Sequence, residues 1–180
     1  MVNSRDHSLV ERCRKGDRQA LEALVGEYER PVYNAAYRIL GNPDDAADAT
    51  QSAFLKAFEN LDRYDPQYKF FSWIYRIAVN ESINQLKRLR RQQPLEEGEA
   101  ADGPGPDDSV EAGHLERELQ AGLMALNEDY RTVIVLRHFS ECSYRQIAEI
   151  LQIPEKTVKS RLYSARHLMK DQLIANGVSF

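Results

Sequence analysis

The last part of the chain carries basic and polar side chains at helical spacing. Between residues 156 and 170 there are five lysines or arginines and no acid. Such a row suits a helix in the major groove of DNA, where some side chains reach base edges and flanking cations hold phosphates. A solvated basic face is the alternative. The row consists of Lys156, Lys159, Ser160, Tyr163, Arg166, His167 and Lys170.

The segment before this row favours DNA binding over the alternative. Residues 143–146 read Ser-Tyr-Arg-Gln, which is a capping box that opens a short helix. A brief break follows at residues 152–153, and Pro154 suits the first turn of the next helix. Two helices joined by a turn of about three residues form a helix-turn-helix.

Aromatic residues are concentrated in a second segment, where six of the chain's sixteen aromatics fall between Tyr64 and Tyr75. Cations interleave with these rings, at Arg63, Lys69 and Arg76. Unpaired bases stack on such rings with about 1–3 kcal/mol per base. Some of the rings, Phe70 and Trp73 among them, are expected to belong to the core, so the cluster divides between packing and base contact.

A polar row follows the aromatic cluster. Arg76, Asn80 and Asn84 recur one helical turn apart, and residues 87–91 add four cations. This pattern suggests that duplex phosphates are held beside the aromatic patch. A row of this kind is also common on a merely solvated helix.

The sequence offers no credible enzyme site. It lacks a Gly-rich phosphate loop, an H-E-x-x-H pair and a nucleophile beside a base, so we expect no catalytic residue, no metal and no cofactor. Cys13 and Cys142 lie too far apart for a C-x-x-C pair, which argues against a disulfide framework or a zinc site. We find no apolar run of about 18 residues and no signal peptide, and expect a cytoplasmic protein.

The acidity of the chain, whose net charge is −4, is concentrated in one short segment. Residues 94–111 carry seven acids and no lysine or arginine, and the stretch is rich in proline and glycine. Such a segment cannot bury enough apolar surface to offset its ordering, so we expect a flexible acidic linker. The predicted organisation is therefore a first domain at 1–93, a linker at 94–112 and a second domain at 113–180.

Both flanking parts have helical periodicity and no clear strand pattern, so the predicted fold is all-α with two small helical domains. Asp17 is a candidate cap and Gly41 a stop for one long helix, and Asn42 with Pro43 starts the next. Further helices are expected at about 8–15, 71–91, 115–126 and after Asn127.

These residues resemble the extracytoplasmic-function sigma factors, which keep two sigma domains, regions 2 and 4, joined by a linker. The likeness covers nearly the whole chain. The stretches that carry it are 41–54 (GNPDDAADATQSAF), 71–80 (FSWIYRIAVN), 143–151 (SYRQIAEIL) and 157–162 (TVKSRL).

The resemblance implies three sets of contact residues. Those expected to bind the clamp helices of the largest polymerase subunit are Asp44, Asp45, Asp48, Gln51 and Phe54. Those expected to capture and open the -10 element are Tyr64, Asp65, Tyr68, Lys69, Phe71, Trp73, Arg76, Asn80, Asn84, Lys87 and Arg88. Those expected to read the -35 element are Lys156, Thr157, Lys159, Ser160, Arg161, Tyr163, Ser164 and Arg166.

The partners implied by the resemblance are core RNA polymerase, through the clamp helices and the flap region, promoter DNA in duplex and single-stranded form, and an anti-sigma factor. The anti-sigma factor is often membrane-bound and would impose the off-state, whereas direct membrane insertion of this chain is not expected.

The chain departs from the family pattern at four positions. Ser52 stands where an acid is usual and Asn84 where Asp is frequent, while Gln152 and Lys156 stand where glycine is common. Gln152 either adopts a left-handed conformation, at roughly 1 kcal/mol of strain, or the turn differs slightly.

A partner is needed on energetic grounds. Opening about ten base pairs at about 1.4 kcal/mol per step costs roughly 14 kcal/mol, which a few stacked bases do not return. We therefore expect promoter opening only with polymerase. Two other readings stay open at this point: a dimeric helix-turn-helix regulator with a sensor domain, and a helical adaptor that binds only proteins.

Overall fold

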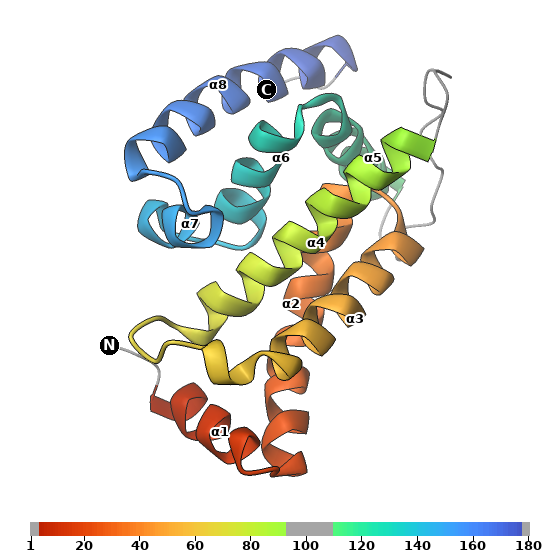
Figure 1. Cartoon of the computed structure of the whole chain (residues 1–180). Helices are drawn as coiled ribbons and strands as arrows, with labels where there is room; N and C mark the ends of the chain where they lie inside the picture. The colour runs from red at the N-terminus through yellow and green to blue at the C-terminus, as the bar shows by residue number, and fades with distance from the viewer. Residues whose placement is uncertain (1–3, 93–109, 178–180) are drawn as a thin grey trace.

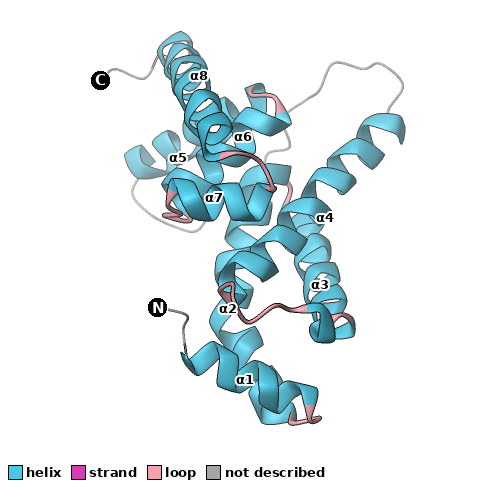
Figure 2. Cartoon of the chain, turned by 60° about the vertical axis from the view of Figure 1, so that its left-hand side comes forward, coloured by secondary structure: helices cyan, strands magenta, loops and turns pink. Residues whose placement is uncertain are grey.

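The computed structural model describes residues 4–92 and 110–177, and within these ranges the chain is helical with no strand (Figures 1 and 2). The predicted all-α class is confirmed. Most of the predicted linker at 94–112 lies outside the described residues. Its last three residues belong to a helix that begins at Val110, before the boundary we predicted.

The first half consists of four helices and a short 3₁₀ turn. In chain order they are α1 (Ser4–Arg14), α2 (Arg18–Leu40), α3 (Pro43–Glu59), the turn η1 (Leu61–Arg63) and α4 (Phe70–Gln92). The Asp17 carboxylate accepts hydrogen bonds from two amides of the first turn of α2, and Gly41 ends that helix with φ of 76°. Asn42 caps α3 ahead of Pro43. The predicted caps and stop are confirmed.

The second half contains the helix-turn-helix. Its elements are α5 (Val110–Ala125), α6 (Glu128–Ile134), the π-helical turn η2 (Val135–Phe139), α7 (Tyr144–Leu151) and α8 (Glu155–Ala175). Ser143 and Gln146 form the predicted capping box at α7. Gln152 ends α7 with φ of 54° and ψ of 42°, so the left-handed alternative holds.

The two halves pack against each other. One hydrophobic cluster runs through both, including Leu24, Phe70 and Ile74 of the first half and Leu123 and Ile147 of the second. Helix α7 lies beside α4, and α5 beside α2, while α1 is at the far end of the molecule from α8 (Figure 1). The side chains near the start of α4 therefore face the second half.

Arg131 of α6 is the most buried cation of this contact, with 4% of its surface exposed. Within its own half it donates to the carbonyls of Leu123, Met124 and Leu126, at the end of α5. Its remaining nitrogen donates to the Ile39 carbonyl of α2 at 2.7 Å. Burial lowers the pKa of Arg131. The cost of burying this charge is offset because every guanidinium nitrogen donates to a carbonyl near the C-terminal end of α2 or α5, where the helix dipole is negative.

Candidate nucleic-acid and protein interfaces

The acidic face of α3, which we define as Asp44, Asp45, Asp48 and Gln51, is largely open. Asp44, Asp48 and Gln51 are exposed, and Asp45 is half-buried where its carboxylate accepts a 2.6 Å hydrogen bond from Gln85 of α4. Phe54 differs from the others because its side chain lies in the core, 6.0 Å from the Phe58 ring. The exposed members offer negative charge to a basic or polar partner surface.

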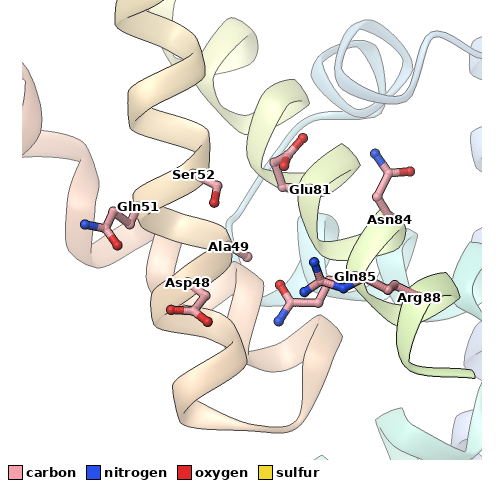
Figure 3. A pocket seen from close by; sticks show the side chains of 8 residues that line it. All are labelled: Asp48, Ala49, Gln51, Ser52, Glu81, Asn84, Gln85 and Arg88. Carbon is pink, nitrogen blue, oxygen red and sulfur yellow. The ribbon is translucent and has the colours of Figure 1, made fainter. Parts of the chain in front are cut away.

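A polar groove of about 330 Å³ lies between α3 and α4 (Figure 3). Its lining residues are Asp48, Ala49, Gln51, Ser52, Glu81, Asn84, Gln85 and Arg88. Sequence reasoning did not single out Glu81 or Gln85, because nothing in their spacing shows that they face α3. The groove joins the acidic face to the polar row of α4.

The aromatic cluster divides between core and surface. The rings of Tyr64, Phe70 and Tyr75 are buried, and those of Phe71 and Trp73 are half-buried. Tyr64 packs 5.8 Å from Phe70 and 5.4 Å from Trp73 between ring centroids. The most exposed ring is that of Tyr68, at 46%, and its neighbours that also reach solvent are Asp65 and Lys69. The loop thus exposes the Tyr68 ring and the Lys69 cation next to a cluster of packed aromatic rings.

Hydrogen bonds hold the loop between η1 and α4 in shape. The Tyr64 hydroxyl donates to the Tyr68 carbonyl at 2.7 Å, and burial raises the pKa of Tyr64. The Asp65 side chain accepts from the Gln67 amide, and the Tyr68 amide donates to the Asp65 carbonyl. The loop therefore has a fixed backbone even though its outer side chains are exposed.

The polar row of α4 begins under the second half and ends in solvent. The Arg76 guanidinium donates to the Glu149 carbonyl in the last turn of α7 at 2.9 Å, and Ser72 is buried 3.4 Å from the Glu149 carboxylate. Further along the helix the side chains are exposed, and these are Asn80, Asn84, Lys87 and Arg88. Helix α7 thus covers the start of the row and leaves its remainder accessible.

Helix α8 presents its polar row outward. Lys156, Lys159, Ser160, Tyr163 and Arg166 are exposed, while Thr157 and Ser164 are half-buried. On the opposite face the core residues are Val158, Leu162, Ala165, Met169 and Leu173. Tyr163, with 68% of its surface exposed, packs edge-on to His167 at 4.6 Å. These positions give α8 one buried face and one exposed, mainly cationic face, as a groove-reading helix needs. On the exposed face Lys159 pairs with Glu155, one turn earlier, at 3.2 Å.

Two arginines of α8 are tied to other elements. Arg161 pairs with Asp129 of α6 at 2.7 Å, so its charge is partly neutralised within the second half. Arg166 donates to His138 of η2 at 3.3 Å. Burial and the cations Arg166 and Arg137 lower the pKa of His138.

Within the described residues, no cluster of three or more His, Cys, Asp or Glu side chains could hold a metal ion. None of the helices in those ranges is both long and apolar enough to cross a membrane.

Comparison with protein families gives two matches that together span most of the chain. Residues 24–92 match sigma-70 region 2, and residues 116–169 match sigma-70 region 4. The chain is 36% identical over 176 residues to the ECF RNA polymerase sigma factor SigW of Bacillus subtilis, covering 91% of this chain and 94% of SigW. It is 31% identical to the RNA polymerase sigma-H factor of Pseudomonas aeruginosa, covering 96% of each chain.

Among solved structures, the chain is similar to CnrH in complex with the cytosolic domain of CnrY. The TM-score is 0.74 at 26% identity, and the match covers 95% of this chain and 98% of CnrH. The likeness to the sigma factor RpoE of Bartonella quintana, at a TM-score of 0.70 and 23% identity over 84% of this chain and 95% of RpoE, is one of fold.

Proposed function

This chain belongs to the extracytoplasmic-function sigma factors of the sigma-70 family, and from that premise we propose how its surfaces serve promoter-specific transcription initiation. The observation that carries the proposal is the separation of three surfaces: the acidic face on α3, the aromatic loop with α4, and the outward row on α8. The family consists of initiation factors, and we infer that this chain acts by binding and not by catalysis.

We assign the acidic face to core RNA polymerase, through the clamp helices of its largest subunit. Asp44, Asp48 and Gln51 are exposed for such a contact, whereas Phe54 would support it from the core. An Asp48→Lys substitution should weaken association with core polymerase by about a hundredfold, since a like charge replaces an attractive one. Asp62→Lys, which makes the same change on η1, is the control. Equal association of both variants would contradict the assignment.

The -10 element is assigned to the aromatic loop and α4. Tyr68 and Lys69 are exposed in the loop that leads into the packed rings of Phe71 and Trp73, which suits capture of one unpaired base. The exposed remainder of the row would hold backbone phosphates beyond it, through Asn80, Asn84, Lys87 and Arg88. Arg76 would join them only after it leaves α7.

The -35 element is assigned to α8. Lys159, Ser160 and Tyr163 are exposed in the N-terminal half of α8, where a recognition helix meets base edges. Lys156 and Arg166 would hold phosphates, and Thr157 and Ser164 flank the row. Arg161 would reach DNA only by giving up Asp129.

The packing of the two halves supports a requirement for polymerase. Arg76 donates to α7, and its Nε atom is buried with no hydrogen-bond partner in the described part of the chain. A guanidinium with an unused donor can gain a phosphate or base partner once the halves separate. By contrast, the acidic face is exposed on α3. We infer that polymerase binds first and that the halves then part to expose the start of α4.

This order can be tested at Arg38 of α2, which lies outside the three proposed surfaces. Its guanidinium pairs with Glu116 of α5, donates to Gln120 at 3.1 Å and lies 4.5 Å from the Phe139 ring centroid. Arg38→Glu should separate the halves because it places like charges together. The radius of gyration should then rise above the value of about 16 Å expected for a compact chain of this length.

The matched control is the charge swap. Adding Glu116→Arg to Arg38→Glu restores an opposite-charge pair and should restore the compact form. The free Arg38→Glu chain should also bind a -10 single strand more tightly than wild type. An unchanged radius, or an opened chain with no gain in strand binding, contradicts the inference.

We further propose control by an anti-sigma factor, and action in the cytoplasm. The solved CnrH structure, 26% identical to this chain, is a complex with the cytosolic domain of CnrY. A stoichiometric inhibitor predicts a threshold: transcription from the target promoters stays low until the chain exceeds its inhibitor, then rises steeply. A rise proportional to the amount of chain from the start would argue against such an inhibitor.

The function as a whole is tested by run-off transcription with core polymerase on a randomised promoter pool. Enrichment of templates with two conserved elements at fixed spacing is expected. A chain that selects duplex DNA without polymerase would instead support a helix-turn-helix regulator, and one that selects no DNA would support a protein-binding adaptor.

A further inference from the structure

Helix α1 lies outside the segment matched by sigma-70 region 2, which begins at residue 24. It is nevertheless firmly seated on the first half. Leu9 and Val10 are buried in the core, and the buried Asp6 carboxylate accepts a 2.7 Å hydrogen bond from the Tyr28 hydroxyl. The Tyr28 ring in turn lies 5.4 Å from Phe70, the first residue of α4. Helix α1 is thus fixed to the same ring cluster that supports the aromatic loop.

Arg14, the last residue of α1, reaches across to the start of that loop. Its Nη2 atom donates to the Leu61 carbonyl at 3.0 Å and to the Tyr64 carbonyl at 2.9 Å. Its Nη1 atom pairs with Glu11 at 2.6 Å, which orients the guanidinium. One carbonyl begins η1 and the other follows its last residue, so a single cation fixes both ends of the turn that leads into the loop.

The Leu61 carbonyl already accepts the Tyr64 amide within the turn at 3.1 Å and takes Arg14 as its second donor, whereas the Tyr64 carbonyl lies just past the end of the turn. Carbonyls at the end of a helix carry partial negative charge and are favourably met by a cation. The Tyr64 carbonyl belongs to the residue whose hydroxyl holds the Tyr68 carbonyl. Arg14 therefore fixes the backbone of Tyr64, and Tyr64 fixes the position of Tyr68, the most exposed ring of the cluster.

We propose that α1 is part of the -10 recognition apparatus and that Arg14 is a positioning residue, which holds the aromatic loop ready to receive an unpaired base. This inference rests on the proposed function of the loop. With 23% of its side chain exposed, Arg14 is turned toward the two carbonyls and acts through Tyr64 and Tyr68. A loop already held in its binding shape loses less conformational freedom when the base enters, so it binds more tightly and selects more strongly.

The test uses holoenzyme assembled with cognate core polymerase and a fluorescent -10 single strand. Arg14→Met keeps the length and apolar stem of the side chain but removes its donors. We expect it to bind the strand about tenfold more weakly, equal to about 1.4 kcal/mol. We also expect it to discriminate less between the preferred base and the other three at the captured position. Arg14→Lys keeps one cationic donor and should recover part of the loss.

The control is Arg18→Met, which removes the same charge four residues away. Arg18 is 88% exposed, and among the described residues it pairs with Glu22 alone, along its own helix, so we expect wild-type strand binding. Polymerase affinity should match wild type for all three variants, because Arg14 and Arg18 lie outside the acidic face of α3. The melting temperature should match wild type for Arg18→Met and fall only slightly for Arg14→Met, which loses its hydrogen bonds to the Leu61 and Tyr64 carbonyls.

Two results would overturn the inference. One is wild-type strand binding and base discrimination by Arg14→Met. The other is a loss of polymerase affinity and a large loss of thermal stability that accompany the loss of strand binding, since these would show that Arg14 stabilises the whole domain and not the loop in particular. Failure of the wild-type holoenzyme to bind the strand is distinguishable from both, because it overturns the proposed function of the loop, and the inference falls with it.

Discussion

Helices α4 and α8, which we propose to read the two promoter elements, differ in how freely they present their polar rows. On α8 the row from Lys156 to Arg166 faces outward and the opposite face is packed within the second half. On α4 the row starts beneath α7, where Arg76 is bound to the Glu149 carbonyl and Ser72 is buried. The -35 reader is therefore complete within its own domain, whereas the -10 reader depends on how the two domains are arranged.

The difference has an energetic cause. A recognition helix needs only one apolar face, and α8 buries its own against α5, α6 and α7. Helix α4 contacts α2 and α3 on one side and α7 on another, so a larger part of its surface is apolar and a smaller part is free. Apolar contact between the halves favours the covered arrangement, and binding to a large partner is a reasonable source of the energy that reverses it.

The largest expected effect comes from removing the buried link between the halves. Arg131→Met leaves four carbonyls, those of Ile39, Leu123, Met124 and Leu126, without their donor. We expect the free energy of unfolding in urea to fall by about 3 kcal/mol. Arg117 is an exposed arginine that donates to the Gly113 carbonyl of its own helix, so Arg117→Met should change the free energy of unfolding little. Equal stability of the two variants would show that Arg131 does not hold the halves together.

The next effect concerns α8 alone. Lys159→Ala combined with Tyr163→Ala should reduce promoter-specific transcription about thirtyfold, equal to about 2 kcal/mol of lost base recognition. Binding to core polymerase and to a -10 single strand should remain at the wild-type level, because both side chains are exposed on the outward face of α8. If strand binding falls together with -35 recognition, the two readers are not independent and the comparison fails.

A smaller effect is expected at Gly41, where the first half meets α5. Gly41 has a φ of 76°, a left-handed conformation that would destabilise the fold by about 1 kcal/mol if alanine had to adopt it. A β-carbon at this position would also lie 2.5 Å from the Met124 sulfur. Gly41→Ala should lower the melting temperature and loosen this contact. Adding Met124→Ala should relieve the contact but not the backbone strain. Gly26→Ala, in open helical space, should instead raise stability slightly.

The smallest effect is a pH dependence within the second half. The pKa of folded His138 is lowered by burial and by Arg166 and Arg137. The unfolded chain, with a pKa of about 6.5, then binds more protons than the folded chain just below that pH. Stability should therefore decline as the pH falls from 6.5 toward the lower folded pKa. Urea unfolding at pH 7.5 and 5.5 measures this, and His138→Gln should show a smaller decline; an equal one would exclude His138 as the cause.

Several features follow from local sequence and are confirmed by the structure. The caps at Asp17 and Asn42, the stop at Gly41 and the capping box at Ser143 involve residues within a few positions of one another. Their hydrogen bonds depend on chain geometry that any short segment can form by itself. Gln152 also follows from local sequence. Either this residue adopts a left-handed conformation or the turn differs slightly, and the left-handed conformation is observed.

The division of the aromatic cluster could not be predicted residue by residue. Spacing groups Tyr64 with Tyr68, yet one ring is buried and the other exposed, because Phe70 and Trp73 from α4 close over Tyr64 only. In the same way, periodicity places Phe54 on the apolar face of α3 while the resemblance places it in the polymerase set, and the observed packing puts it in the core.

By itself, the sequence determined that helices form, the capped ends of α2, α3 and α7, the helix-turn-helix and the family, because these depend on periodicity, on capping over a few residues and on motifs in a fixed order. The starts of α1 and α5 were predicted several residues too late. Only the tertiary structure decided the distant partners of three arginines. Arg14 meets Leu61 and Tyr64, Arg76 meets Glu149, and Arg131 meets Ile39, each across at least 47 positions of the chain. A long cationic side chain can serve many acceptors equally well, so its partner is set by which helix ends are brought together and not by its neighbours in sequence.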